Sequence, residues 1–229
     1  LDATLRTLAP QNGENYLDLT AGYGGHASAF LQATGNYEES TLVDRDDYAI
    51  SHLSHLAEQG AQLLHTDFLT AARQLVEEGA QFSLILIDLG VSSPQLDQGE
   101  RGFSFTENGP LDMRMDRRQT VSAADIVNKS SAVELTKIIY EYGEEPYSRA
   151  KAIAEAIVAA RPFHETGELA ELIAQTLRGR KGRIHPATRT FQALRIAVND
   201  ELGQVEKLLP LLPRLLKSGG RVGVISFHS

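Results

Sequence analysis

Short apolar runs alternate with amphipathic segments along the N-terminal part of the chain. Each apolar run has the length of a strand, and apolar residues in the segments between recur three and four positions apart, which is the helical period. Strands and helices in regular alternation predict a parallel sheet covered by helices on both faces. The predicted strands span residues 16–20, 40–43, 61–64 and 82–87.

An acidic residue stands close to the carboxyl end of every one of these strands. They are Asp18, Asp44, Asp67 and Asp88. Open parallel sheets bind ligands at this edge, so four carboxylates there indicate a binding site. The alternative for each one is a helix cap after the strand.

A glycine-rich turn follows the first strand. Gly22, Gly24 and Gly25 lie between Asp18 and a helix-compatible segment. Strand, glycine turn and helix in that order present backbone N–H groups and a helix N-terminus to a ligand. The turn also fits the dinucleotide fingerprint G-x-G-x-x-A, ending at Ala27, so NAD and S-adenosylmethionine both come into question.

The other strand ends favour S-adenosylmethionine. With either ligand, Asp44 ends the second strand where a carboxylate accepts hydrogen bonds from an adenosine ribose, and Phe68 is placed to pack on an adenine ring. A pyrophosphate would meet the negative charge of Asp18, whereas a cationic sulfonium with an amino acid tail suits Asp18 and Asp88. An NAD-dependent oxidoreductase stays as the alternative.

The pattern changes after Gly90. Residues 91–118 have no helical or strand period and are rich in Gly, Pro, Asp and Arg, which is typical of a functional loop. Helical segments then run from about 122 to 177, with a capping box at Ser131 and Thr166 as a further cap. An amphipathic helix over 191–209 and a fifth strand over 221–225 return the chain to the sheet. We therefore expect a discontinuous α/β domain, 1–112 and 186–229, with an all-helical insert at 113–185.

Composition narrows the class of protein. The net charge of −8 argues against a surface that binds nucleic acid throughout, but local groups of arginines remain. The chain has no cysteine and no apolar run long enough for a membrane span, which predicts a cytoplasmic protein. No histidine has partners at metal-ligand spacing, so we expect no metal.

Several long blocks resemble the bacterial 16S ribosomal RNA cytosine-N4 methyltransferases, a class I S-adenosylmethionine-dependent family. The blocks occur in the family's order at 18–26, 44–46, 88–97, 100–105, 109–115, 185–196 and 225–229. The resemblance implies a Rossmann-like methyltransferase sheet with a helical insert for RNA recognition. It implies methyl transfer to the exocyclic amine of a cytidine in the decoding region of small-subunit rRNA. It also implies further residues before Leu1 and after Ser229.

The resemblance assigns roles to individual positions. Expected cofactor contacts are Gly24, Gly25, His26, Asp44, Phe68, Asp88 and Gln95. Candidate RNA contacts are Arg101, Arg114, Arg180, Lys181, Arg183, His185 and Arg189. The partner is then small-subunit rRNA or the assembled small subunit, and the helices of the insert suit an RNA face or a homodimer face equally.

The chemistry is expected at the end of the fourth strand. Asp88 and Ser93 are the candidates for holding the cytosine amine, because an acceptor on its N–H turns the nitrogen lone pair toward the methyl group. The alternative for Ser93 is a purely structural part of the turn at Ser92 to Gln95. A protein that binds the cofactor and assists RNA assembly without chemistry is the second functional alternative.

Overall fold

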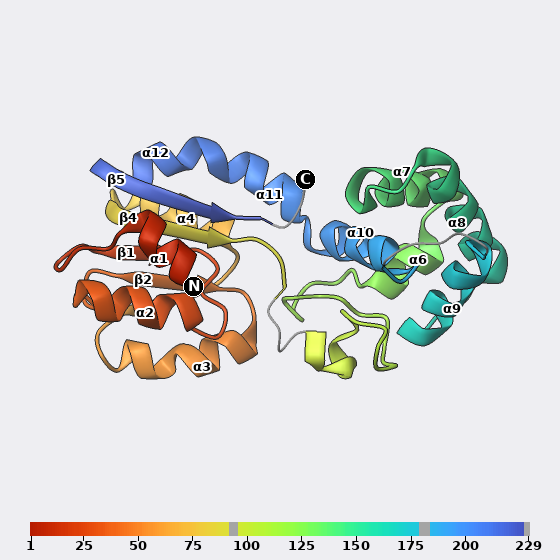
Figure 1. Cartoon of the computed structure of the whole chain (residues 1–229), viewed down its shortest axis with the longest axis horizontal. Coiled ribbons are helices and arrows are strands. Elements are labelled where there is room, and N and C mark those ends of the chain that lie inside the picture. Colours follow the sequence, from red (N-terminus) through yellow and green to blue (C-terminus); the bar gives the residue numbers. More distant parts are fainter. Residues whose placement is uncertain (92–95, 179–183, 227–229) are drawn as a thin grey trace. The chain divides into compact units, whose positions relative to one another are not determined.

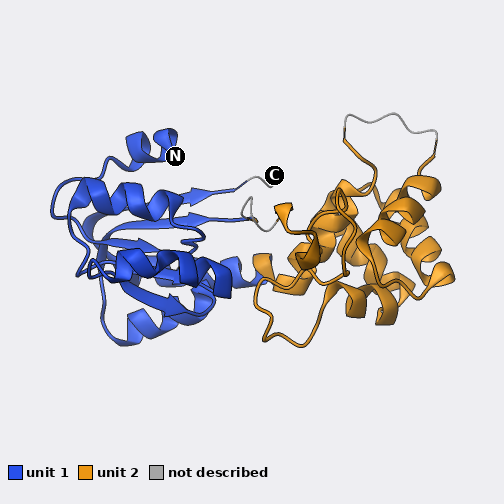
Figure 2. Cartoon of the chain, turned by 90° about the horizontal axis from the view of Figure 1, so that it is seen from below, with its two compact units in different colours: residues 1–90, 202–229 blue, residues 91–201 orange. Residues whose placement is uncertain are grey.

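A computed structural model of the chain describes residues 1–91, 96–178 and 184–226. The chain forms two compact units: Leu1–Gly90 with Leu202–Ser229, and Val91–Glu201 (Figure 2). Within the described residues, no helix is both long and apolar enough to cross a membrane.

The first unit is a parallel sheet of five strands in the order β3-β2-β1-β4-β5 (Figure 1). Its strands are β1 Tyr16–Asp18, β2 Thr41–Asp44, β3 Gln62–His65, β4 Phe82–Asp88 and β5 Leu216–Ile225. Its helices are α1 Asp2–Leu8, α2 Gly25–Thr34, α3 Asp47–Ala57, α4 Phe68–Glu77, α11 Glu201–Leu208, η2 Leu209–Leu211 and α12 Leu212–Leu215. α11 begins at the boundary residue Glu201. The doubly wound α/β prediction is confirmed.

Alternate residues of a strand point to opposite faces of the sheet and pack in two separate hydrophobic cores. Leu84 and Leu86 of β4 pack with α1, α2 and α3, whereas Ile85 and Ile87 pack with α4 and α12. Both faces of the sheet are therefore covered, which explains why the β4 sequence is apolar without alternation. The chain leaves β1 toward β2 and later returns to its other side as β4. This change of direction creates the switch point at which such sheets bind ligands.

The second unit has no strand among its described residues. It consists of η1 Gly99–Arg101, α6 Ala123–Lys129, α7 Ala132–Gly143, α8 Tyr147–Ala160, α9 Thr166–Thr176 and α10 Thr188–Asn199. The capping box at Ser131 is confirmed: its hydroxyl accepts from the Glu134 N–H, and the Glu134 carboxylate accepts from the Ser131 N–H.

The helical unit is longer than the expected insert at 113–185. It begins earlier, at Val91, and ends later, at Glu201. The cause is burial in the helical core. Phe103, Leu111 and Met113 of the long loop belong to that core, and so do Phe191 and Leu194 of α10. The sequence pattern places most of these residues in the sheet domain, because a loop without period gives no indication of which core it covers.

Three local predictions also differ from the structure. The helix expected over 191–209 is two helices, α10 and α11, because Asp200 between them adopts a left-handed conformation with φ of 47°. Thr166 does not cap α9 but is its first residue, and its hydroxyl accepts from the Gly109 N–H. β5 starts before Gly219, which has a φ of 77°, and its pairing with β4 shifts register there.

Candidate functional site

Asp18 at the end of β1 is turned into the protein. It is 1% exposed, accepts from the Tyr16 hydroxyl at 2.6 Å and from the Thr20 N–H at 3.1 Å. Burial is the largest influence and raises the pKa of Asp18 to about 7, against the opposing effect of these two donors. Asp18 therefore holds the start of the turn in place, and its burial turns its charge away from the surface where a ligand would bind.

The glycines that follow leave the backbone accessible. Gly22 and Gly24 have φ of 52° and 84°, the left-handed region that glycine adopts without strain. Gly24 also packs against Leu53, since a Cβ there would lie 3.0 Å from its Cδ2 atom. Gly25 begins α2, is exposed, and has open space where a Cβ would stand. A ligand can approach the main chain at this helix N-terminus.

Asp44 at the end of β2 holds the turn from the neighbouring strand. Its Oδ2 accepts from the Gly22 N–H at 2.8 Å and its Oδ1 from the Asp46 N–H at 2.9 Å. Burial raises the pKa of Asp44, although both donors favour the charged form. Each carboxylate oxygen can accept a second hydrogen bond, so Asp44 fits the predicted ribose diol.

Asp88 and His26 face each other across the switch point. His26 Nδ1 lies 3.8 Å from Asp88 Oδ2, and His26 Nε2 lies 3.3 Å from the Thr4 hydroxyl. The Asp88 N–H donates to the Thr20 hydroxyl at 2.6 Å, which fixes the end of β4 against the turn. Both side chains remain partly exposed, Asp88 at 36% and His26 at 22%.

Burial acts on this pair in opposite directions. It raises the pKa of Asp88 and lowers that of His26, while the attraction between the two groups partly offsets each shift. The edge therefore offers a carboxylate that holds a proton more readily than usual, beside an imidazole that is readily neutral.

The third strand end is a helix cap. Asp67 Oδ1 accepts from the N–H groups of Leu69 and Thr70 at the start of α4, at 3.1 and 2.9 Å. Phe68 is 6% exposed and packs in the core between the sheet and α4. Its expected contact with adenine stays a prediction.

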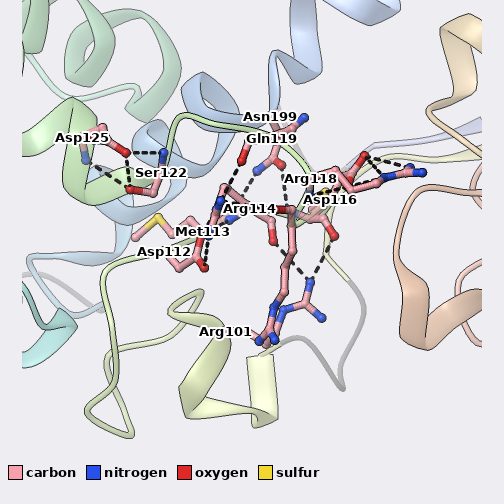
Figure 3. Close-up of polar contacts among 12 residues, drawn as sticks. Arg101, Asp112, Met113, Arg114, Asp116, Arg118, Gln119, Ser122, Asp125 and Asn199 are labelled. Carbon is pink, nitrogen blue, oxygen red and sulfur yellow. Dashed lines mark hydrogen bonds and ion pairs between the residues drawn. The ribbon is translucent and has the colours of Figure 1, made fainter.

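The long loop after β4 is held by its arginines (Figure 3). Arg101 is 2% exposed and donates to the carbonyl groups of Arg114 and Met115. Arg114 binds both oxygens of Asp112 and the carbonyl of Gln119. These contacts give Arg101 and Arg114 a structural role in the loop, and the RNA contacts expected for them stay predictions.

Asn199 at the end of α10 also belongs to this loop, although no sequence signal indicates it. Asn199 is fully buried; its Oδ1 accepts from the Met115 N–H at 3.0 Å and its Nδ2 donates to the Met113 carbonyl at 2.8 Å (Figure 3). Its amide satisfies main-chain groups of a segment without regular structure, and no local pattern encodes such a long-range pairing.

Two other candidate RNA contacts are described. His185 is exposed, its ring lies 4.6 Å from that of Phe105, and its Nδ1 accepts from the Ala187 N–H. Arg189 donates to the Glu144 carbonyl at 3.1 Å. Ser93, Gln95, Arg180, Lys181 and Arg183 lie outside the described residues.

This sheet order, with a glycine turn after β1, a carboxylate after β2 and another after β4, is the arrangement of a Rossmann-like class I methyltransferase fold. The chain matches the model of the MraW methylase family over residues 1–229. It therefore belongs to the MraW methylase family, whose methyl donor is S-adenosylmethionine.

Relatives with nearly half of their residues identical support this membership. The chain is 49% identical to the ribosomal RNA small subunit methyltransferase H of Synechocystis sp., covering 99% of this chain and 75% of the relative. It is 46% identical to the enzyme of the same name from Acidobacterium capsulatum, covering 100% of this chain and 80% of the relative. Among solved structures, a SAM-dependent methyltransferase from Agrobacterium tumefaciens is 14% identical with a TM-score of 0.31, covering 38% of this chain and 29% of that chain.

Proposed function

We propose that this chain transfers a methyl group from S-adenosylmethionine to the exocyclic N4 amine of a cytidine in the decoding region of small-subunit rRNA. The names of the relatives support rRNA as the substrate, and the sequence blocks described above support the cytidine amine. The observation that carries the chemistry is the partly exposed Asp88 carboxylate beside His26 at the switch point.

The cofactor residues fit an adenosine with a cationic tail. The open space over Gly25 admits the ligand to the helix N-terminus, and Asp44 accepts from the ribose hydroxyls. Asp88 supplies negative charge close to where the sulfonium and the methionine amine would lie. When bound, S-adenosylmethionine supplies a methyl group that its positively charged sulfur activates toward nucleophiles.

Asp88 is the proposed group that manages the acceptor amine. The cytosine N4 lone pair is delocalised into the ring, so the amine is a weak nucleophile. A carboxylate that accepts from N4–H turns the lone pair toward the methyl carbon. As the N–C bond forms and the C–S bond breaks, one N4 proton passes to Asp88 directly or through a water, and its raised pKa assists this transfer.

Basic residues that follow α9 in the sequence are the proposed contacts to the RNA backbone. Phosphate contacts fix the orientation of an RNA and make its affinity depend on salt. The target base must leave its stack to reach the cofactor, as it does in other enzymes that modify bases. Arg180, Lys181, Arg183 and Arg189 stay as candidates for these contacts, together with the exposed ring of His185.

Labelled methyl transfer to purified small subunits and to free small-subunit rRNA tests the function. We expect label in N4-methylcytidine after digestion to nucleosides. Label in another nucleoside would contradict the proposed acceptor atom. Binding of RNA and cofactor without incorporation of label into either substrate would favour the alternative of an assembly factor without catalysis.

Substitution of Asp88 tests the chemical step. We expect Asp88→Asn to lower the rate of methyl transfer about 10²- to 10⁴-fold, because the amide accepts a hydrogen bond but does not take up the proton. Asp47→Asn is the matched control, since it removes one exposed carboxylate at the same sheet edge. Single-turnover kinetics with saturating cofactor measure the methyl-transfer step apart from cofactor binding. An unchanged single-turnover rate would remove Asp88 from the mechanism.

A further inference from the structure

A buried carboxylate stands where α7 ends and α8 begins. Glu145 is 5% exposed, and its Oε2 accepts no hydrogen bond from the described residues. Two guanidinium groups approach it without closing to hydrogen-bond distance. Arg149 Nη1 lies 3.7 Å from Oε2, and Arg189 Nη1 lies 4.0 Å from Oε1. The buried charge is therefore compensated by two arginines at once.

The backbone around Glu145 brings the two arginines together from distant parts of the chain. Arg149 is in the first turn of α8, and Arg189 is in the first turn of α10. Gly143 lets the end of α7 press against α10, because a Cβ there would lie 2.6 Å from the Arg189 carbonyl oxygen. Glu144 has a φ of 53°, and its carbonyl accepts from Arg189 Nη1 at 3.1 Å. The spacing of the two arginines is thus set by helix packing.

Both guanidinium groups keep donors for a further partner. The side chains of Arg149 and Arg189 are 37% and 40% exposed. Among the described residues, the guanidinium of Arg149 donates no hydrogen bond, and that of Arg189 donates one, to the Glu144 carbonyl. A guanidinium has five N–H donors in a planar arrangement that matches the oxygens of a phosphate. Two such groups above one buried carboxylate carry a net positive charge and suit a single bridging anion.

We propose that Arg149 and Arg189 bind one backbone phosphate of the rRNA substrate, with Glu145 as the positioning residue that holds both guanidinium groups. This inference rests on the proposed function, because it takes RNA to be the substrate. It adds Arg149 to the candidate RNA-binding residues, pairs it with Arg189 at one phosphate, and gives Glu145 a positioning role.

The salt dependence of RNA affinity tests the arginine pair. We expect Arg149→Ala and Arg189→Ala each to weaken binding of small-subunit rRNA several-fold and to reduce the slope of log K against log salt by up to about one. Because both groups bind one phosphate, the double variant should lose less than the sum of the single losses. Lys151→Ala is the matched control: it removes an exposed positive charge of the same helix and should keep the wild-type slope. Unchanged slopes for both arginine variants would overturn the proposal.

Glu145→Gln distinguishes positioning from plain electrostatics by the sign of its effect. Removing a negative charge next to RNA strengthens binding if only net charge matters. If Glu145 holds the arginines in place, the variant should weaken binding several-fold although it has lost a negative charge. Stronger or unchanged binding by a folded variant would overturn the positioning role. If Glu145→Gln does not fold, the Arg149→Ala result still decides the proposal, because Arg149 lies at the surface.

Two further measurements separate this inference from the proposed function. Cofactor affinity of every variant reports whether the sheet unit is intact and should equal that of the wild type. Methyl transfer by the wild type reports the function itself. If the wild type methylates rRNA while the arginine variants keep its affinity and salt slope, only the phosphate site is wrong. If the wild type neither binds nor methylates rRNA, the proposed function fails as well.

Discussion

Asp18 and Asp88 end neighbouring strands, yet their surroundings give them different chemistry. Asp18 is buried and accepts from two donors of its own unit, whereas Asp88 is partly exposed beside His26. Burial raises the pKa of both carboxyls. Only Asp88 can exchange a proton with a substrate, because only its oxygens are accessible. The same residue type at equivalent strand ends thus has a structural role in one strand and a proposed catalytic role in the other.

The buried Asp18 predicts how stability depends on pH. Its pKa is about 7 in the folded protein and near the ordinary 3.8 when unfolded, so the folded state binds more protons between these values. The contribution of Asp18 to stability is therefore full below pH 4 and is lost as pH rises to about 7, by at most about 4 kcal/mol. Urea denaturation gives the free energy of unfolding of the wild type and of Asp18→Asn at each pH. As pH rises from 4 to 7, the variant should become increasingly more stable than the wild type. A constant difference would contradict the burial argument.

At the scale of elements, the loop before α6 is ordered by side chains and not by secondary structure. Arg101 and Arg114 bind its carbonyl groups from within, and Asn199 binds it from α10. Met113 has a φ of 60°, which a non-glycine residue adopts only when its surroundings impose it. The buried side chains of Phe103 and Met113 then fasten the loop to the helical core.

Asn199→Ala should loosen this loop. The substitution leaves the Met115 N–H and the Met113 carbonyl buried without their partner, which we expect to cost about 2–4 kcal/mol in the free energy of unfolding of the helical unit. Amide hydrogen exchange at Met115 should accelerate correspondingly. Lys129→Ala is the control: it removes an exposed ion pair with Asp125 and should cost less than about 1 kcal/mol. Slow exchange at Met115 in the Asn199 variant would show that other contacts order the loop.

At the scale of the whole molecule, each unit has its own core. The sheet unit packs its strands between two groups of helices, and the helical unit buries a separate apolar cluster. The described cofactor-site residues, from Gly22 to Asp88, all lie in the sheet unit. The Arg149 and Arg189 pair lies in the helical unit. The proposed cofactor contacts and the proposed RNA contacts therefore belong to separate cores, and the two kinds of binding can be tested separately.

Cofactor binding should stabilise the two units unequally. At a hundred times its Kd, S-adenosylmethionine stabilises the unit it binds by about 2.7 kcal/mol. Hydrogen exchange should slow most in the glycine turn and around Asp44, and least in α7, α8 and α9. NAD at the same concentration is the control and should protect neither region. Equal protection of both units, or protection by NAD, would contradict the placement of the cofactor.

The sequence by itself determined the alternation of strands and helices, the glycine turn and the acidic strand ends, because all of these are local patterns of period and residue type. The long specific blocks also determined the family, since each block is a continuous run of residues. The capping box at Ser131 was equally local and is confirmed. What these signals have in common is that residues close in sequence carry them.

Only the tertiary structure decided which of these residues are available for chemistry and which are structural. It turned Asp18 and Arg101 inward, made Asp67 a helix cap, and placed Asn199 on a loop far away in sequence. It also assigned Phe103 and Leu111 of the long loop and α10 to the helical core and brought Arg149 and Arg189 to the same buried carboxylate. The physical reason is that burial and long-range hydrogen bonding depend on packing between distant segments, which the pattern of any one segment does not contain.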